Sequence, residues 1–207
     1  MALLTNLNVT KSTFYVDIKK YKDTITVSNS VFHHMQNGNF DGLQITNDME
    51  ARSQNLPVSQ HIDRTTYIEN CYFSNRGRAG DSMDELASAV RGTEVIFSNC
   101  VFDCNGKGVL VGSGEFIDHD IDEEHLNVTF DYCVFRNCSR RNPMVQRGNV
   151  LMRNCLVENW GVPETFHEKS FGARASDYGT LEVFRTLFIQ RGFFKCINKN
   201  DPSTGRR

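Results

Sequence analysis

The chain has 207 residues, enough to bury the core of one domain, and no linker-like segment divides it. Its 23 Lys and Arg against 25 Asp and Glu give a net charge of −2, which lacks the basic excess typical of nucleic-acid or anionic-membrane binding. No stretch approaches the roughly 20 apolar residues of a membrane span, and residues 1–8 are too polar for the core of a secretory signal. We therefore expect no nucleic acid and no membrane among its partners.

Residue types favour β-structure throughout. Fifteen Phe, mostly beside β-branched residues, accompany only one Trp and four Pro, and this composition is typical of strands. Seven Cys are an odd number, at spacings that match neither paired zinc knuckles nor a Cys-x-x-Cys redox site. We expect these cysteines to be thiols rather than disulfides.

The chain begins with a strand-like segment, residues 3–10, that no amphipathic cap precedes. The first coil of a stack of parallel strands would then present an open edge, which invites pairing with other chains. We expect either a partner or a missing segment to cover this edge.

A short motif then recurs along the chain, of the form apolar-x-Asn-(Ser/Cys)-x-Phe. Its six copies are residues 27–32, 68–73, 97–102, 130–135, 152–157 and 184–188, the last of them one residue short. Within each copy apolar and polar residues alternate, as a half-buried strand requires, and a polar or Gly-rich segment follows. Each copy is predicted to be a strand followed by a turn.

The intervals between the final positions of successive copies are irregular, at 41, 29, 33, 22 and 31 residues. Propeller blades or helical repeats would be more uniform, whereas a solenoid of parallel strands tolerates insertions at its turns. The shortest interval, 22 residues at about 3.3 Å each, is long enough for three short strands and three turns. We predict an all-β, three-sided parallel β-helix over residues 1–198, followed by a disordered tail, 199–207.

Equivalent positions in such a stack lie about 4.8 Å apart and form ladders along its axis. The third positions predict a ladder of buried amides, Asn29, Asn70, Asn99 and Asn154. The fourth positions predict a column of thiols, Cys71, Cys100, Cys133 and Cys155. Metal or redox chemistry is the alternative for these thiols, and we favour small buried side chains. The repeated Phe position predicts an aromatic stack.

Several segments share their order and spacing with the strands of one enzyme family. Residues 105–113 match its His-Asp-Lys-x-x-Leu-x-Gly-(His/Ser) rung, 127–135 its Val-Thr-x-His-His-Asn-x-Phe strand, and 141–148 its Arg-x-Pro-x-x-Arg-x-Gly pattern. Residues 154–160 follow where the family has Asn-Asn-x-Tyr/Phe, with weaker matches at 41–45 and 84–86. The chain resembles the pectate lyases, polysaccharide lyase family 1. That resemblance implies a right-handed, single-stranded parallel β-helix and a secreted protein.

The resemblance also implies cleavage of an acidic polysaccharide, pectate or a related polyuronate, by β-elimination. Removal of the C5 proton leaves enolate-like charge beside the uronate carboxylate, so cations must face the substrate. Arg141 matches the family's general base, although a guanidinium with a pKa above about 12 is hard to deprotonate. Lys107 matches the cation that binds the carboxylate. The family's second Arg falls on Gln146, and the adjacent Arg147 could supply that charge.

The same resemblance implies calcium, with Asp41, Asp84 and Glu85 as candidate ligands. The second acidic residue of the family's calcium motif falls near Ser88. Calcium takes about six to eight oxygens, so such a site would depend on water and substrate.

Two alternatives stay open at this point. Arg141 could be a solvated turn residue in a basic cluster with Arg136, Arg140 and Arg147. The whole chain could likewise be a non-catalytic β-helix, such as a glycan-binding or structural fibre or tailspike-like module.

Overall fold

The computed structural model describes residues 1–10, 12–33, 41–47, 63–75, 85–90, 94–112, 125–161 and 172–190. The predicted tail, 199–207, and the candidate ligand Asp84 lie outside these residues. Among the described residues, strands predominate, and no helix is long and apolar enough to cross a membrane.

The strands are short and follow one another in a regular order. They are β1 (Ala2–Thr5), β2 (Asn8–Thr10), β3 (Phe14–Asp17), β4 (Ile25–Ser28), β5 (Val31–His33), β6 (Leu43–Thr46), β7 (Thr65–Glu69), β8 (Tyr72–Ser74), β9 (Ala87–Ala89), β10 (Glu94–Ser98), β11 (Val101–Lys107), β12 (Val109–Val111), β13 (Asn127–Asp131), β14 (Val134–Arg140), β15 (Met144–Arg153), β16 (Leu156–Glu158), β17 (Arg174–Phe184) and β18 (Leu187–Ile189). One 3-10 helix, Ile18–Lys20, follows β3.

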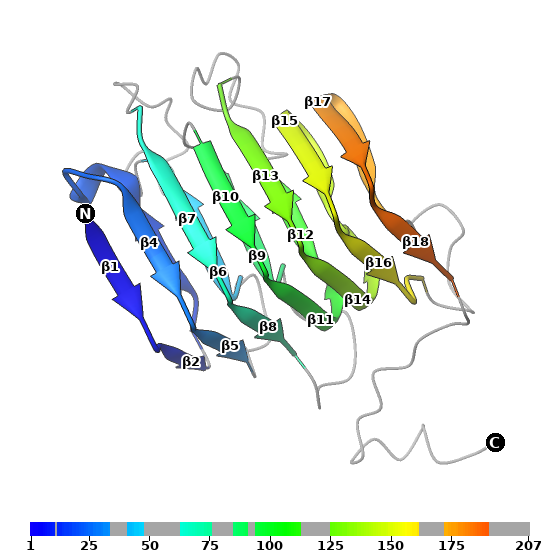
Figure 1. The fold of residues 1–207 in the computed structure, drawn as a ribbon, viewed down its shortest axis with the longest axis horizontal. Coiled ribbons are helices and arrows are strands. Elements are labelled where there is room, and N and C mark those ends of the chain that lie inside the picture. Colours follow the sequence, from blue (N-terminus) through cyan, green and yellow to red (C-terminus); the bar gives the residue numbers. More distant parts are fainter. Residues whose placement is uncertain are drawn as a thin grey trace.

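All strand pairs in the described residues are parallel, and the neighbour of each strand comes from the coil before or after it. We name three faces: the first holds β1, β4, β7, β10 and β13, the second holds β2, β5, β8, β11, β14, β16 and β18, and the third holds β3, β6, β9 and β12. Strand β15 pairs with β12 at its start and with β13 further along, so it joins the third and first faces into one strongly curled sheet. This arrangement, seen from the side in Figure 1, is compatible with a parallel β-helix or a similar solenoid.

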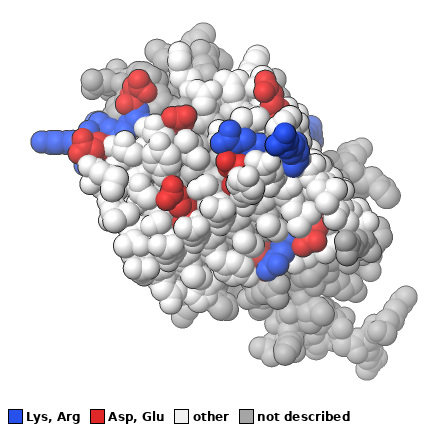
Figure 2. Space-filling view, viewed as in Figure 1, with Lys and Arg blue, Asp and Glu red and all other residues white. Residues whose placement is uncertain are grey.

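Charged side chains are sparse on the side of the molecule formed by the first and second faces. Figure 2 shows acidic and basic residues interspersed over a largely uncharged surface, with no patch of a single sign among the described residues in view. This side therefore offers no concentrated field for a charged partner.

The predicted register of the repeats is confirmed. Strand pairing places Phe32, Phe73, Phe102, Phe135, Val157 and Phe188 in one continuous row. An additional copy precedes the predicted ones, because Val9 pairs with Phe32. The final copy is not one residue short: Val183 pairs with Met152, so the copy begins at Val183 and has full length.

The predicted aromatic stack is confirmed. Ring centroids lie 4.7 Å apart for Phe32 and Phe73, 5.0 Å for Phe73 and Phe102, and 4.8 Å for Phe102 and Phe135. Phe97 and Phe130 form a second stack, 5.0 Å apart, whose members pack edge-on against the first. All of these rings are buried, so the two stacks fill the interior and tie successive coils together.

The predicted ladder of buried amides is wrong. Asn29, Asn70 and Asn99 are exposed, and Asn154 is only half-buried. Their shared property is a left-handed backbone, with φ of 50°, 53°, 52° and 55° in that order, at the turn between the first and second faces. Asn is selected there because its short polar side chain tolerates this conformation.

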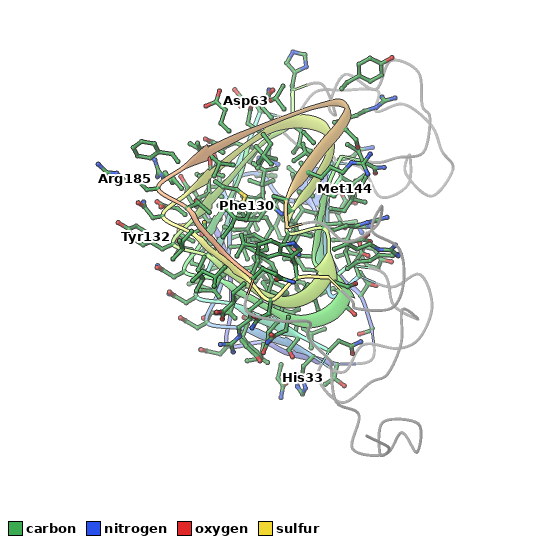
Figure 3. All side chains as sticks on the ribbon, turned by 90° about the vertical axis from the view of Figure 1, so that its right-hand side faces the viewer. His33, Asp63, Phe130, Tyr132, Met144 and Arg185 are labelled. Atoms are coloured by element: carbon green, nitrogen blue, oxygen red, sulfur yellow. The ribbon has the colours of Figure 1, made fainter. Side chains whose placement is uncertain are left out.

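Two copies use other residues at this turn. Tyr132, with φ of 52°, and Arg185, with φ of 46°, hold the same conformation without Asn. Figure 3 shows both at one corner of the triangular outline, with Phe130 inside it and Met144 on the opposite side. The position of the corner is therefore set by the fold and not by Asn alone.

The predicted column of reduced thiols is confirmed. Cys71, Cys100, Cys133 and Cys155 are buried and free. Each Sγ contacts the carbonyl two residues earlier and a carbonyl of the preceding coil, as Cys100 does with Ser98, at 3.4 Å, and Ile68, at 3.3 Å. Burial, together with hydrogen bonding to the neighbouring thiols, raises the pKa of Cys100 well above its ordinary value. The four thiols act as buried packing groups of the core.

Candidate functional site

Three of the predicted site residues share one row at the corner between the second and third faces, and a fourth lies beside it. Counting back two residues from the paired positions Leu43, Ala87 and Val109 reaches Asp41, Glu85 and Lys107. Lys107 pairs with Arg140 and Leu110 pairs with Met144, so the later coil has one extra residue and Arg141 directly follows the partner of Lys107. We refer to Asp41, Glu85, Lys107 and the adjacent Arg141 together as the row.

Backbone hydrogen bonds hold this row in place from coil to coil. The Gly42 N–H donates to the Glu85 carbonyl at 3.1 Å, the Leu86 N–H to the Gly108 carbonyl at 2.8 Å, and the Val109 N–H to the Arg141 carbonyl at 2.6 Å. Gly108 itself has no room for a side chain, because a Cβ there would lie 2.4 Å from the Arg141 carbonyl oxygen. The backbone therefore brings Lys107 and Arg141 onto adjacent coils, about 4.8 Å apart along the axis.

Arg141 directly follows the end of β14 and has a left-handed backbone conformation, with φ of 63°. Its Nη1 donates to Oε1 of Glu85 in an ion pair. The Glu85 side chain is 2% exposed and that of Arg141 is 21% exposed, so solvent screens the pair only weakly. The carboxylate stabilises the positive charge of Arg141, and this opposes the role of Arg141 as a general base.

Asp41 is surrounded by hydrogen-bond donors. Its Oδ1 accepts from the Glu85 N–H at 3.2 Å, and its Oδ2 accepts from Gln44 Nε2 at 3.1 Å and from the Ser88 hydroxyl. Asp41, Gln44 and Ser88 are all buried, at 6%, 9% and 1% exposure. The carboxylate is thus stabilised by three donors, which come from β6, from β9 and from Glu85, two residues before β9.

Gln44 and Ser88 were missed as site residues by reasoning from the sequence. They pair with each other in register on β6 and β9, and every residue of these two strands is buried. A polar residue inside a fully buried strand needs hydrogen-bond partners. This requirement could have identified Gln44 and Ser88, but only if the burial of both strands had been known.

Asp41 and Glu85 do not fit a calcium site in this arrangement. Calcium binds through oxygen lone pairs, and a carboxylate offers about four acceptor positions. Asp41 already accepts three hydrogen bonds, and Glu85 is neutralised by Arg141. Within the described ranges, no group of three or more His, Cys, Asp or Glu is placed to hold a metal ion.

Arg147 lies away from the row. It follows Val145 at the far end of the third face, where its guanidinium carbon is 5.8 Å from the ring centroid of Tyr178. The backbone of Arg147 also packs against Gly112, where a Cβ would lie 2.6 Å from the Arg147 nitrogen. Arg147 is therefore not brought together with Lys107 and Arg141.

The basic cluster considered from the sequence is divided by the fold. Arg136 pairs on the second face with the fully buried Asp103, at 3.3 Å, and Asp103 also accepts from Tyr72 and Asn137. Burial opposes the charge of Arg136, yet the Asp103 carboxylate raises the pKa of Arg136 above its ordinary value. Arg136, Arg141 and Arg147 thus have separate partners and do not form one solvated cluster.

Comparison with known proteins finds no matching family model and no curated protein similar to this chain. The interpretation of the site therefore rests on the residues themselves.

Proposed function

We propose that the chain is a right-handed, single-stranded parallel β-helix of the pectate lyase type that binds an acidic polysaccharide on its third face. The substrate class is pectate or a related polyuronate, and the proposed reaction is β-elimination by a secreted protein. The observation that carries the proposal is the position of Lys107 and Arg141 on adjacent coils at the corner between the second and third faces.

Cations on adjacent coils suit the chemistry of a uronate chain. A guanidinium can form two parallel hydrogen bonds to one carboxylate, whereas an ammonium acts as a compact charge. When the C5 proton leaves, the new charge spreads onto that same carboxylate, so a cation bound there stabilises the transition state more than the ground state. We assign carboxylate binding and charge stabilisation to Lys107 and Arg141.

Proton removal is the harder step for these residues. A neutral guanidinium is rare at pH 7, and the ion pair with Glu85 favours the charged form of Arg141 further. We therefore expect cleavage, with Arg141 as the base, to increase as the pH rises into the alkaline range.

A second candidate is a glycan-binding module without catalysis. It is favoured by the Arg141–Glu85 ion pair, which holds the proposed base in its charged form, and by Gln146 at the position of the family's second Arg. Both candidates require the same cations to bind the polysaccharide, and they differ only in the fate of the C5 proton.

The experiment that tests the proposal follows the ultraviolet absorbance of the unsaturated uronide product on polygalacturonate at alkaline pH. Lys107→Ala and Arg141→Ala are compared with the wild type. Arg153→Ala is the matched control, because Arg153 pairs with Asp131 on the first face and its loss removes the same charge elsewhere. The proposal expects product from the wild type and the control, and at least about a hundredfold less from the two site variants.

Absence of product with the wild type, while the polysaccharide still binds, would favour the non-catalytic candidate. Equal loss of activity in the control and in the site variants would contradict the assignment of the reaction to this row.

A further inference from the structure

We infer that the site on the third face works without a divalent cation, because protein donors already bind the two described carboxylates that would be its ligands. The Arg141 guanidinium lies against Glu85, and the Gln44 amide and Ser88 hydroxyl lie against Asp41. The inference concerns the same site and rests on the proposed function for its meaning in glycan binding.

Charge is balanced within the cluster. The row contains two carboxylates, Asp41 and Glu85, and two cations, Lys107 and Arg141. Two buried carboxylates without compensation would favour an external cation. Here Glu85 has a cationic partner of its own, and Asp41 has three neutral donors on its two oxygens, so the drive to recruit calcium is removed.

The same contacts perform the structural task that a bridging metal ion could perform. The donors to Asp41 are 3, 44 and 47 residues away in sequence, and Arg141 is 56 residues from Glu85. The cluster therefore ties together the coils that contain β6, β9 and the start of β15. Removal of calcium should leave this connection intact.

We expect the polysaccharide to be bound directly by protein side chains and not through a metal ion. A site that holds calcium can bind a uronate carboxylate through the metal ion, whereas this site offers Lys107 and Arg141 themselves. Binding should then be insensitive to chelators and sensitive to monovalent salt, as contacts between charged side chains are.

The test uses the intact protein, and its first measurement is made without polysaccharide. Thermal unfolding is measured in about 10 mM calcium, well above the Kd of weak calcium modules, and again with magnesium and with a chelator. The inference expects the same Tm for the wild type in all three solutions. A rise in Tm with calcium alone that Glu85→Gln abolishes would overturn it.

Gln44→Glu is a variant that should gain calcium binding at Asp41. The substitution keeps the shape of the side chain but replaces a donor to Asp41 by a second carboxylate, and like charges at that distance favour either a shared proton or a bound cation. We expect calcium to raise the Tm of this variant by roughly 5 °C or more. Ser88→Ala, which removes a donor without adding charge, is the control and should not respond. A folded Gln44→Glu variant whose Tm does not respond to calcium at a pH where both carboxylates are ionised would contradict the claim that these donors keep the cation out.

Binding of an oligogalacturonate with and without chelator separates this inference from the proposed function. Binding that requires calcium would overturn the inference and leave the proposed function standing. A wild type that binds no oligogalacturonate in either solution, with an unchanged Tm in calcium, would overturn the proposed function and support the cation independence of the site.

Discussion

The guanidinium of Arg141 lies against the buried carboxylate of Glu85, 56 residues earlier in the chain, and donates a hydrogen bond to it. This contact joins two coils of the curled parallel sheets. It also favours the charged form of Arg141, which is one of the two cations that we assign to the substrate carboxylate. Its energetic cost and benefit can be separated by substitution, because each partner can be neutralised alone.

Arg141→Ala should destabilise the protein by about 3 kcal/mol, since it leaves the Glu85 carboxylate buried without a cation. Adding Glu85→Gln to the same chain should recover part of this loss, because a neutral amide tolerates burial better than a charge. Urea unfolding of the two single variants and the double variant gives the coupling free energy directly. Strictly additive effects would show that the ion pair contributes nothing.

Phe102→Ala should cost about 4 kcal/mol of unfolding free energy. Its ring lies between Phe73 and Phe135, at 5.0 and 4.8 Å, so truncation opens a cavity in the middle of the stack. Phe188→Ala is the matched control in the same row on the last described coil, where the side chain is 38% exposed, and it should cost roughly 1 kcal/mol. Equal losses measured by urea unfolding would refute the view that the stack stabilises the interior.

The row of Phe32, Phe73, Phe102 and Phe135 could be predicted from the sequence, because each copy of the motif repeats the same alternation of buried and exposed residues. The thiol column could be predicted for the same reason. Both features depend only on equivalent positions in successive coils, and strand register places those positions side by side.

The role of the repeated Asn could not be predicted correctly from the pattern alone. A recurring Asn is consistent with a buried amide ladder and with a left-handed turn residue, and the two differ in backbone conformation rather than in residue type. Tyr132 and Arg185 at the same position were the available signal, since neither side chain could replace a buried amide. The motif was also too strict for the first coil, where Leu7 and Val9 stand in place of Cys and Phe.

The residues of the candidate site could be predicted from the sequence, whereas their side-chain contacts could not. Lys107 and Arg141 were identified by their resemblance to the pectate lyase motifs, and the fold places them on adjacent coils, with Arg141 one residue beyond the partner of Lys107. The partners of Asp41 and Glu85 depend on side-chain geometry across separate coils. No local pattern in the sequence indicates that Gln44 and Ser88 donate to Asp41 or that Arg141 donates to Glu85.

Tyr132→Asn should stabilise the protein by about 1 kcal/mol. Tyr132 holds a φ of 52° and is 62% exposed, so the substitution relieves an unfavourable backbone conformation and loses little burial. Asn99→Ala, which introduces the same strain at an equivalent turn, should destabilise by a similar amount. Urea unfolding gives the free energy of unfolding of both variants. A Tyr132→Asn variant less stable than the wild type would show that the packing of the Tyr132 side chain outweighs its backbone strain.

The Cys100 thiol should lower the stability of the protein in alkaline solution, whereas hydrogen bonding within the same column lowers the pKa of Cys71 and Cys133 and acts in the opposite sense. Burial raises the pKa of Cys100 in the folded state, so the stabilising contribution of the neutral thiol is complete below the unfolded pKa of about 8.5. That contribution is lost as the pH rises toward the folded value, because the unfolded chain releases its proton first. Cys100→Ser removes this group, and Ser30 already occupies the equivalent position with its hydroxyl on the Ser28 carbonyl at 2.7 Å.

Urea unfolding between about pH 7 and pH 10 tests this dependence. The unfolding free energy of the wild type should fall more steeply above about pH 8.5 than that of Cys100→Ser. Identical slopes would mean that Cys100 does not titrate with folding.

The central claim, that Lys107 and Arg141 bind a polyuronate, is tested most directly by calorimetric titration of oligogalacturonate into the wild type, Lys107→Ala and Arg153→Ala. The account predicts binding by the wild type and by Arg153→Ala, and at least about tenfold weaker binding by Lys107→Ala, the cost of losing one charged hydrogen bond. Binding by Lys107→Ala as tight as that of the wild type, or an equal loss in Arg153→Ala, would contradict it.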